Sequence, residues 1–335
     1  MKVANRVSFE VRPYRDEDEA RVLELLRVSL GGGPAGDRSP AFFRWKHFEN
    51  PFGRSHMLVA EQQGRLVGLR AFMRWELTTG DRTVRAVRAV DTATHPEFRG
   101  QGVFRRLTLQ ALDDLRGDAE LVFNTPNEKS LPGYLKMGWR TVGRAPVWIR
   151  ARRPLRVLRG FRTARGPTGM RAGPPVAAVT ADEALRDAEG LQSFWGPYPG
   201  AGLATRRSLE YLRWRYGRAP LLGYRAVRHG DAIGIFRVRP RGGLWETTVA
   251  ELLVPSGDRA TPRRLLSAIR RAAGVDHVAC SFPAGSQQAR ALRAAGFVRV
   301  PGGMTLVVNP LAGDLPIDPT DLSSWALALG DLEVF

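Results

Sequence analysis

Cysteine is almost absent from this chain, because its 335 residues include a single one, Cys280. One cysteine excludes a disulfide framework and a cysteine-rich metal cluster, and it indicates a reducing compartment. The five histidines show no metal-ligand spacing, so we expect no metal. The sequence also lacks an apolar run of the ~18 residues that a membrane span needs, and residues 1–20 lack a signal-peptide core. We therefore expect a cytoplasmic protein without a membrane partner.

Acidic residues are few relative to basic ones. The chain has 33 Asp and Glu against 51 Lys and Arg, a net charge of +18, and a pI near 11.2. This excess favours polyanionic partners such as nucleic acid, acidic substrates or phosphorylated cofactors. It is nearly all arginine, so a genome biased toward arginine codons explains it equally well. Charge alone leaves the class of partner open.

The first 150 residues alternate between strand-like and helix-like segments, which predicts an α/β fold. Strands are expected where apolar residues alternate or run together, and helices where they recur every three to four positions. Strands are predicted at 7–15, 56–63, 65–77, 84–95, 120–125 and 139–150, and helices at 18–30, 39–51, 104–117 and 129–138.

The second part of the chain repeats the first. At a constant offset of 158 residues, 104–115 aligns with 262–273 and 134–142 with 292–300. Several matches in one order argue for two copies of one fold. We predict a catalytic domain at 1–150, an arginine-rich linker at 151–175, a degenerate second domain at 176–310 and a tail at 311–335. The linker has no acid, and a phosphate-binding arm is the alternative to a solvated connection.

A turn with two glycines precedes the predicted helix at 104–117, in the segment HPEFRGQGVFRRL. Gly100 and Gly102 let the backbone approach a ligand closely, and the first amides of a helix point outward at the positive end of its dipole. Arg99 and Gln101 add side-chain donors. The turn therefore predicts an anion site suited to a pyrophosphate, and it matches neither a P-loop nor a dinucleotide-binding fingerprint.

This block resembles the GCN5-related N-acetyltransferase (GNAT) superfamily. Arg99, Gly102 and Phe104 stand where the family has Arg or Gln, then Gly, then Gly or Ala, so Phe104 departs from the usual small residue. Asn127, Ser130, Tyr134 and the pair Gly138-Trp139 match its downstream motif. The resemblance implies two tandem GNAT-like domains, each a mixed, splayed central sheet flanked by helices.

The resemblance also implies an acyl-coenzyme A site, most simply for acetyl-CoA, between two splaying parallel strands. The amides from Arg99 to Phe104, that of Val103 included, would hold the pyrophosphate. The edge formed by Thr92, Ala93 and Thr94 would pair with the pantetheine amides, and the N–H near Ala93 would polarise the thioester carbonyl. Asn127 and Ser130 would lie at the cofactor arm.

Two proton transfers are needed for transfer to an amine. Tyr134 stands where the family places its general acid, and a phenol's ordinary pKa of ~10 suits a thiol's ~8.5. A tyrosine that only packs its ring is the alternative. Asp91 is the first candidate base. The alternative is that Asp91 is a structural acid paired with an arginine such as Arg88. Tandem acetyltransferases of the enhanced-intracellular-survival type use their terminal carboxylate as the base. By this resemblance Phe335 is the second candidate base. The alternative is a docked tail without a catalytic role.

The second copy lacks these groups. Arg99, Gly100, Gln101 and Gly102 align with Gly257, Asp258, Arg259 and Ala260, and Tyr134 aligns with Leu292. We therefore expect the second copy to be inactive.

Three functions remain open from the sequence. The first is an N-acyltransferase that acts on a small-molecule or peptide amine. The second is an aminoacyl transferase that takes its donor from charged tRNA. The third is a non-catalytic module that senses coenzyme A.

Overall fold

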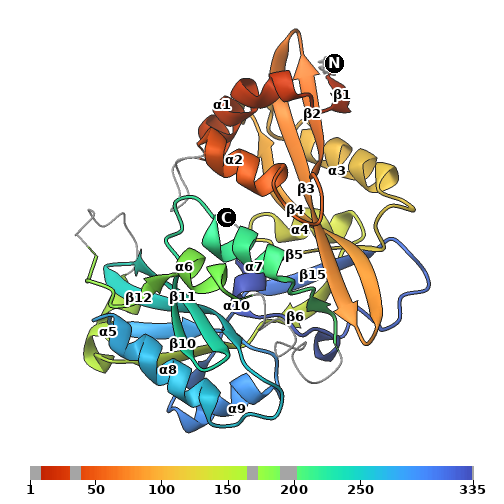
Figure 1. Cartoon of the computed structure of the whole chain (residues 1–335). Helices are drawn as coiled ribbons and strands as arrows, with labels where there is room; N and C mark the ends of the chain where they lie inside the picture. The colour runs from red at the N-terminus through yellow and green to blue at the C-terminus, as the bar shows by residue number, and fades with distance from the viewer. Residues whose placement is uncertain (1–8, 31–38, 164–172, 189–201, 334–335) are drawn as a thin grey trace.

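The computed structural model describes residues 9–30, 39–163, 173–188 and 202–333 (Figure 1). The first half comprises β1 (Glu10–Pro13), α1 (Glu19–Leu30), α2 (Pro40–His47), β2 (His56–Gln62), β3 (Arg65–Thr79), β4 (Arg82–Thr94), α3 (Val103–Asp114), β5 (Leu121–Asn124), α4 (Leu131–Lys136), β6 (Arg140–Arg144) and β7 (Val147–Ala151). The remainder comprises α5 (Pro154–Thr163), β8 (Val179–Thr180), α6 (Ala181–Arg186), β9 (Ala204–Thr205), α7 (Leu209–Leu212), β10 (Arg225–His229), β11 (Ala232–Arg241), β12 (Leu244–Leu253), α8 (Thr261–Ala272), β13 (His277–Cys280), α9 (Gln287–Ala294), β14 (Val298–Val300), β15 (Thr305–Pro310) and α10 (Leu329–Leu332).

The strands form two mixed sheets with the same order of pairing. The first runs β1-β2-β3-β4-β5-β15-β6, with β9 added to β3, and the second runs β8-β10-β11-β12-β13-β7-β14. Within each sheet one pair of neighbours is parallel, β4 with β5 and β12 with β13. The predicted fold class, mixed sheets flanked by helices, is confirmed.

Each half of the chain gives one strand to the sheet of the other half. β15, from the end of the second half, lies between β5 and β6 and is antiparallel to both. In return β7 lies between β13 and β14 and is antiparallel to both. Neither sheet is therefore built from one continuous range of residues, and each is incomplete without the other half.

The single closing strand predicted at 139–150 is wrong. The segment contains two strands, β6 and β7, which belong to different sheets. Pro146 stands between them, and proline cannot donate to a ladder of backbone hydrogen bonds, so the strand is interrupted there. The predicted linker also contains structure, because α5 occupies Pro154–Thr163.

Corresponding elements lie at a nearly constant spacing along the chain. The helices α3 and α8 both have 12 residues and begin at Val103 and Thr261, which are 158 positions apart. The strands β7 and β15 begin at Val147 and Thr305, again 158 positions apart. The offset found in the sequence is therefore also the offset between equivalent helices and strands.

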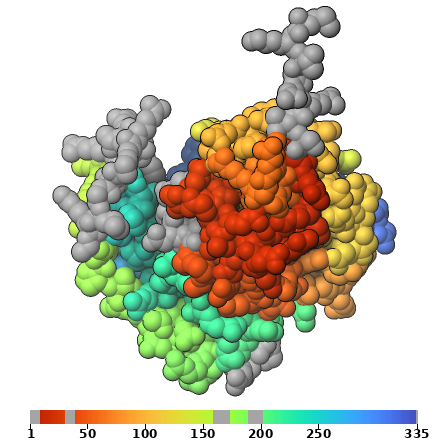
Figure 2. Space-filling model, turned by 90° about the horizontal axis from the view of Figure 1, so that it is seen from above, coloured from red at the N-terminus to blue at the C-terminus, as the bar shows by residue number. Residues whose placement is uncertain are grey.

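The two halves share one hydrophobic core. A single cluster of buried side chains takes Trp45 and Trp75 from the first half and Trp214 and Tyr216 from the second. The surface of α1 and α2 (red) borders the green surface of the segment around α7 in Figure 2. Two further clusters lie under α3 and under α8. Cys280 is buried in β13, as its strand context predicts.

Candidate active site

The turn before α3 has the backbone geometry of an open anion site. Gly100 and Gly102 have φ angles of 79° and 82°, and a Cβ on either would meet no heavy atom within 4 Å. Gly102 is the N-cap of α3 and leaves the first helical amides without a side-chain acceptor. Arg99 donates to Ser29 O at 3.0 Å and Gln101 to Glu97 O at 3.1 Å, so both side chains brace the loop.

Beside this turn, β4 separates from β5. The two strands pair only over Ala86–Arg88 with Leu121–Phe123, and β4 continues to Thr94. A register irregularity between Leu69 and Ala71 of β3 faces this part of β4. Asp91 lies in it with a φ of 37°, which is unusual for a residue other than glycine. The edge that contains Thr92, Ala93 and Thr94 is thus left without β5 as a neighbour.

Tyr134 lies at the inner end of this opening and hydrogen bonds to a buried cation. Its side chain is 4% exposed, and its hydroxyl oxygen accepts from Nη1 of Arg70 at 2.9 Å. Arg70 Nη1 also donates to Thr92 Oγ1, and its guanidinium lies 4.2 Å from the ring of Phe72. Arg70 is fully buried, and its Nε and Nη2 have no hydrogen-bond partner in the structure. The site therefore holds buried donors that are not yet satisfied.

Phe104 fits the site because a glycine makes room for it. Its ring lies edge-on to Tyr134 with centroids 5.5 Å apart. A Cβ on Gly133, in α4, would lie 3.0 Å from Phe104 Cε1. The large residue at 104 and the missing side chain at 133 thus compensate, and Phe104 helps to fix the ring of Tyr134 between α3 and α4.

Asp91 is held by two residues of α2. Its Oδ2 lies 2.9 Å from Lys46 Nζ and 2.9 Å from His47 Nε2. Both partners are buried, and His47 Nδ1 also lies 2.9 Å from Ser55 Oγ. The considered pairing with Arg88 is not found, because Arg88 contacts Leu332 O and the rings of Trp75 and Phe123. The strained backbone at Asp91 is therefore anchored to α2.

Asn127 and Ser130 form the turn that begins α4. Asn127 Oδ1 accepts from the amides of Lys129 and Ser130 at 3.0 Å each, and Ser130 Oγ donates to Asn127 O at 3.2 Å. These contacts fix the start of α4 and so the position of Tyr134. Their predicted contact with a cofactor arm stays a prediction.

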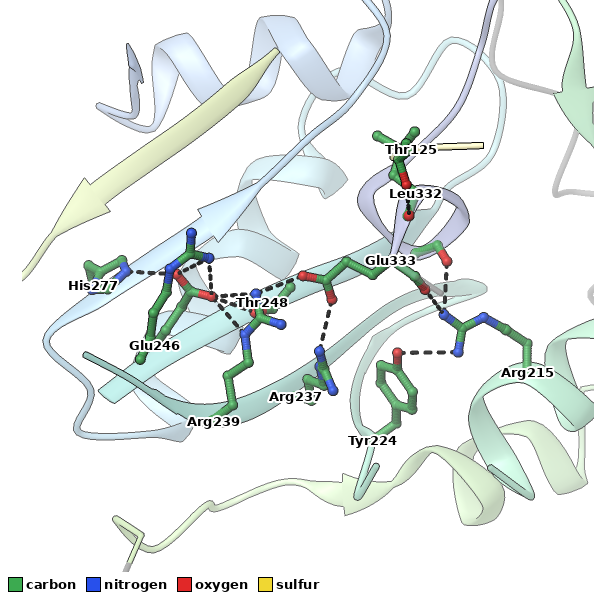
Figure 3. Close-up of polar contacts among 12 residues, drawn as sticks. Thr125, Arg215, Tyr224, Arg237, Arg239, Glu246, Thr248, His277, Leu332 and Glu333 are labelled. Carbon is green, nitrogen blue, oxygen red and sulfur yellow. Dashed lines mark hydrogen bonds and ion pairs between the residues drawn. The ribbon is translucent and has the colours of Figure 1, made fainter. Parts of the chain in front are cut away.

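The last described residues dock between the two halves (Figure 3). Leu332 O accepts from Thr125 Oγ1 at 3.3 Å, next to the end of β5. Glu333 is held from the second sheet, by Arg237 at 3.0 Å and Arg239 at 2.6 Å, and its carbonyl accepts from Arg215 at 2.6 Å. Phe335 lies outside the described residues, so its terminal carboxylate stays a predicted base.

At the equivalent position before α8, within the described residues, the second half has no open turn. Asp258, which aligns with Gly100, accepts from the amides of Ala260 and Thr261 at 2.9 and 3.0 Å. A side-chain hydrogen bond with Thr261, together with these two amide hydrogen bonds, holds the pKa of Asp258 below its usual range. The start of α8 is thus occupied by a carboxylate of the chain itself, where α3 leaves its amides open.

Arg70, Lys46 and His47 belong to this site, and sequence reasoning missed all three. Arg70 lies inside a predicted strand, and Lys46 and His47 lie in a predicted helix, where neither belongs to a motif of known spacing. The signal available was weak: a charged residue amid the apolar run of 65–73. Within the part of the chain that is described, no group of His, Cys, Asp and Glu is arranged to hold a metal ion. No helix there has the length and apolar character of a membrane span.

Comparison with known proteins agrees with this geometry. A family model described as an acetyltransferase (GNAT) domain matches residues 10–142. A protein of unknown function from Enterococcus faecalis V583, called a probable N-acyltransferase, is similar over 91% of this chain and 72% of its own, with TM-score 0.62 and 13% identity. Eis1 from Mycobacterium abscessus is similar over 91% and 74%, with TM-score 0.58 and 16% identity.

A putative acetyltransferase from Pyrococcus horikoshii covers 97% of this chain and 96% of its own, with TM-score 0.55 and 11% identity. At such identities the likeness shows the fold alone. A search of curated proteins finds no match. The family model and the open turn coincide in the first half, so residues 10–142 are an acetyltransferase (GNAT) domain, the transferase part of this chain.

Proposed function

We propose that this protein transfers an acyl group, most simply acetyl, from acyl-CoA to an amine of a small molecule or peptide, by direct attack in a ternary complex. The open glycine turn at the start of α3 carries this proposal. It lies beside the separation of β4 from β5, with Tyr134 and Arg70 at the inner end. The unsatisfied helix amides and the buried donors of Arg70 fit a ligand that has both phosphates and a polar thioester.

Acyl-CoA, when bound, supplies the thioester whose acyl carbon the amine attacks. Val103 and Phe104 would hold the pyrophosphate through their amides, and Thr92, Ala93 and Thr94 would pair with the pantetheine. Asp91, anchored at the bulge, is the proposed acceptor of the amine's proton. Tyr134 would give its proton to the leaving sulfur, while Arg70 holds the phenol oxygen.

We also propose that the second half is a non-catalytic copy of the same fold. The support is the equal order of strands in the two sheets, the 158-residue spacing of α3 and α8, and the capping of α8 by Asp258. In this proposal the chain divides at residues 150, 175 and 310, and each of the two halves gives one strand to the sheet of the other. In this role the second half is a scaffold and one wall of the acceptor pocket.

An aminoacyl transferase that uses charged tRNA is the second candidate. The net charge of +18 favours it, because lysine and arginine neutralise nucleic-acid phosphates. It predicts that RNA co-purifies and that activity is lost under ribonuclease. A third possibility, a module that senses coenzyme A, predicts binding without turnover.

Calorimetry with acetyl-CoA, before and after ribonuclease treatment, separates these functions. We expect binding in both samples and acetylation of at least one amine from an acceptor panel. The variant Tyr134→Phe should bind acetyl-CoA as the parent does and turn over at least tenfold more slowly. Full activity of this variant would refute the role of Tyr134. If the ribonuclease-treated protein did not bind acetyl-CoA, the proposal that acyl-CoA is the acyl donor would be refuted.

A further inference from the structure

A cavity in the second half is lined by arginines and by no acid. It has a volume of about 370 Å³, and its polar lining is Arg150, Arg152, Arg270, Arg271 and Ser267. Arg150 belongs to β7 and Arg152 follows it, whereas the others belong to the last two turns of α8. The exchanged strand β7 thus brings cations of the first half against a helix of the second.

The arginines of this cavity repel one another. Partial burial, together with the charges of Arg150, Arg152 and Arg271, lowers the pKa of Arg270, and no acid offsets this effect. The nearby acid Asp276 is committed elsewhere, because it binds Arg153 at 3.5 Å, Arg156 at 3.3 Å and the amide of Trp245 at 2.8 Å. The excess positive charge therefore lacks a counter-ion within the described chain.

A helix end alone does not explain the cluster. Arg270 and Arg271 lie in the last turn of α8, where cations complement the helix dipole. Arg150 and Arg152 come from another element and add like charge at the same place. Arg271 Nη1 donates to Ser267 Oγ at 2.7 Å, which leaves the hydroxyl proton available to a ligand.

We propose that this cavity binds a ligand with adjacent phosphate groups. Guanidinium forks match phosphate oxygens in pairs, and the volume lies within the ~300–1,000 Å³ of small-molecule sites, well above the need of one phosphate. A free oligophosphate and an RNA backbone both offer this chemistry. The site lies on α8 and β7, away from the turn at α3, so it is independent of the proposed acyl transfer.

The test is calorimetry with inorganic triphosphate and, separately, a single-stranded RNA of 20 nucleotides, both at low salt. Saturating acetyl-CoA is present so that the turn at α3 is filled. The double variant Arg150→Gln/Arg270→Gln should weaken binding of the triphosphate, the RNA or both at least tenfold. The matched control Arg228→Gln/Arg263→Gln removes two exposed arginines outside the cavity and should change the affinity less than twofold.

Each outcome decides the proposal or its source. Binding of triphosphate that depends on Arg150 and Arg270 identifies a free oligophosphate, and binding of RNA alone identifies a nucleic-acid backbone. The variant Arg150→Lys/Arg270→Lys keeps the charge and should retain part of the affinity, which separates recognition from misfolding. The proposal is overturned if neither triphosphate nor RNA binds, or if the control variant loses as much affinity as the double variant in the cavity.

Discussion

Trp45 and Trp214 exchange hydrogen bonds across the two halves of the chain. The indole Nε1 of each donates to the backbone carbonyl of the other, at 2.8 Å in both directions, and the rings stack with centroids 5.1 Å apart. Reciprocal contacts of this kind are expected where two equivalent surfaces meet about a twofold axis. Together with the exchange of β7 and β15, they make the halves mutually dependent.

Trp45→Phe should lower the free energy of unfolding by about 1–3 kcal/mol, because the buried carbonyl of Trp214 loses its donor. Trp214→Phe should have a similar effect, and the double variant should reveal a coupling of about 0.5–3 kcal/mol. Urea unfolding measures all three. Trp139→Phe is the control, since the buried Nε1 of Trp139 has no hydrogen-bond partner to lose. An equal loss in the control would contradict the role of the exchanged bonds.

The sequence predicted the local elements of this fold but not the exchange of strands. Alternation in residues 139–150 shows that strands form there, yet side-chain periodicity carries no information on which sheet a strand joins. The glycine turn and Tyr134 could be proposed as site residues from the sequence, because their expected chemistry depends on residue type at fixed spacing. Arg70, Lys46 and His47 were not, because they reach the site through contacts between distant elements.

Gly102→Ala should separate backbone strain from ligand binding. Gly102 and Gly257 have φ angles of 82° and 84°, so alanine costs about 1–2 kcal/mol of stability at either position. Only the turn at Gly102 has open amides, since Asp258 caps the other. Acetyl-CoA affinity, measured by calorimetry, should fall at least tenfold in Gly102→Ala and stay unchanged in Gly257→Ala. Equal weakening in both variants would argue against the site at α3.

Glu246 should make the stability of the protein depend on acid pH. Burial opposes its ionisation, but the hydrogen bond from His277 and the charges of Arg239 and Arg241 hold its pKa well below the usual range. Because the pKa of Glu246 is lower in the folded protein, its ionised carboxylate stabilises the fold fully above the unfolded pKa of 4.5. This stabilisation is lost as the pH falls through the folded pKa.

Glu246→Gln should therefore lower the free energy of unfolding by about 3 kcal/mol at pH 7, and the deficit should shrink toward pH 3. Urea unfolding at pH 7, 5, 4 and 3 measures this difference. Glu24→Gln, which removes an exposed partner of Arg27, should have little effect at any pH. A deficit in Glu246→Gln that stays constant with pH would rule out the ion pair as its cause.

Arg70→Met tests whether the buried cation acts through Tyr134. Methionine fills a similar volume without charge, so the fold should persist, because a buried charge that has no ion-pair partner is itself costly to desolvate. We expect a fall in kcat of about tenfold with little change in KM, since the phenol loses the donor that orients it and offsets its charge after proton transfer. Arg70→Lys, which keeps one cation at the site, should recover part of the rate.

The decisive comparison is the double variant Arg70→Met/Tyr134→Phe. If Arg70 works through the phenol, removing it from a protein that already lacks the hydroxyl should slow turnover less than twofold further. Arg70 would then be a positioning residue whose effect is contained in that of Tyr134. If the losses in turnover rate of the two single variants instead multiply in the double variant, Arg70 contacts the acyl donor or the amine directly. The buried Nε and Nη2 of Arg70, which have no hydrogen-bond partner in the structure, would then be the atoms that donate hydrogen bonds to the substrate.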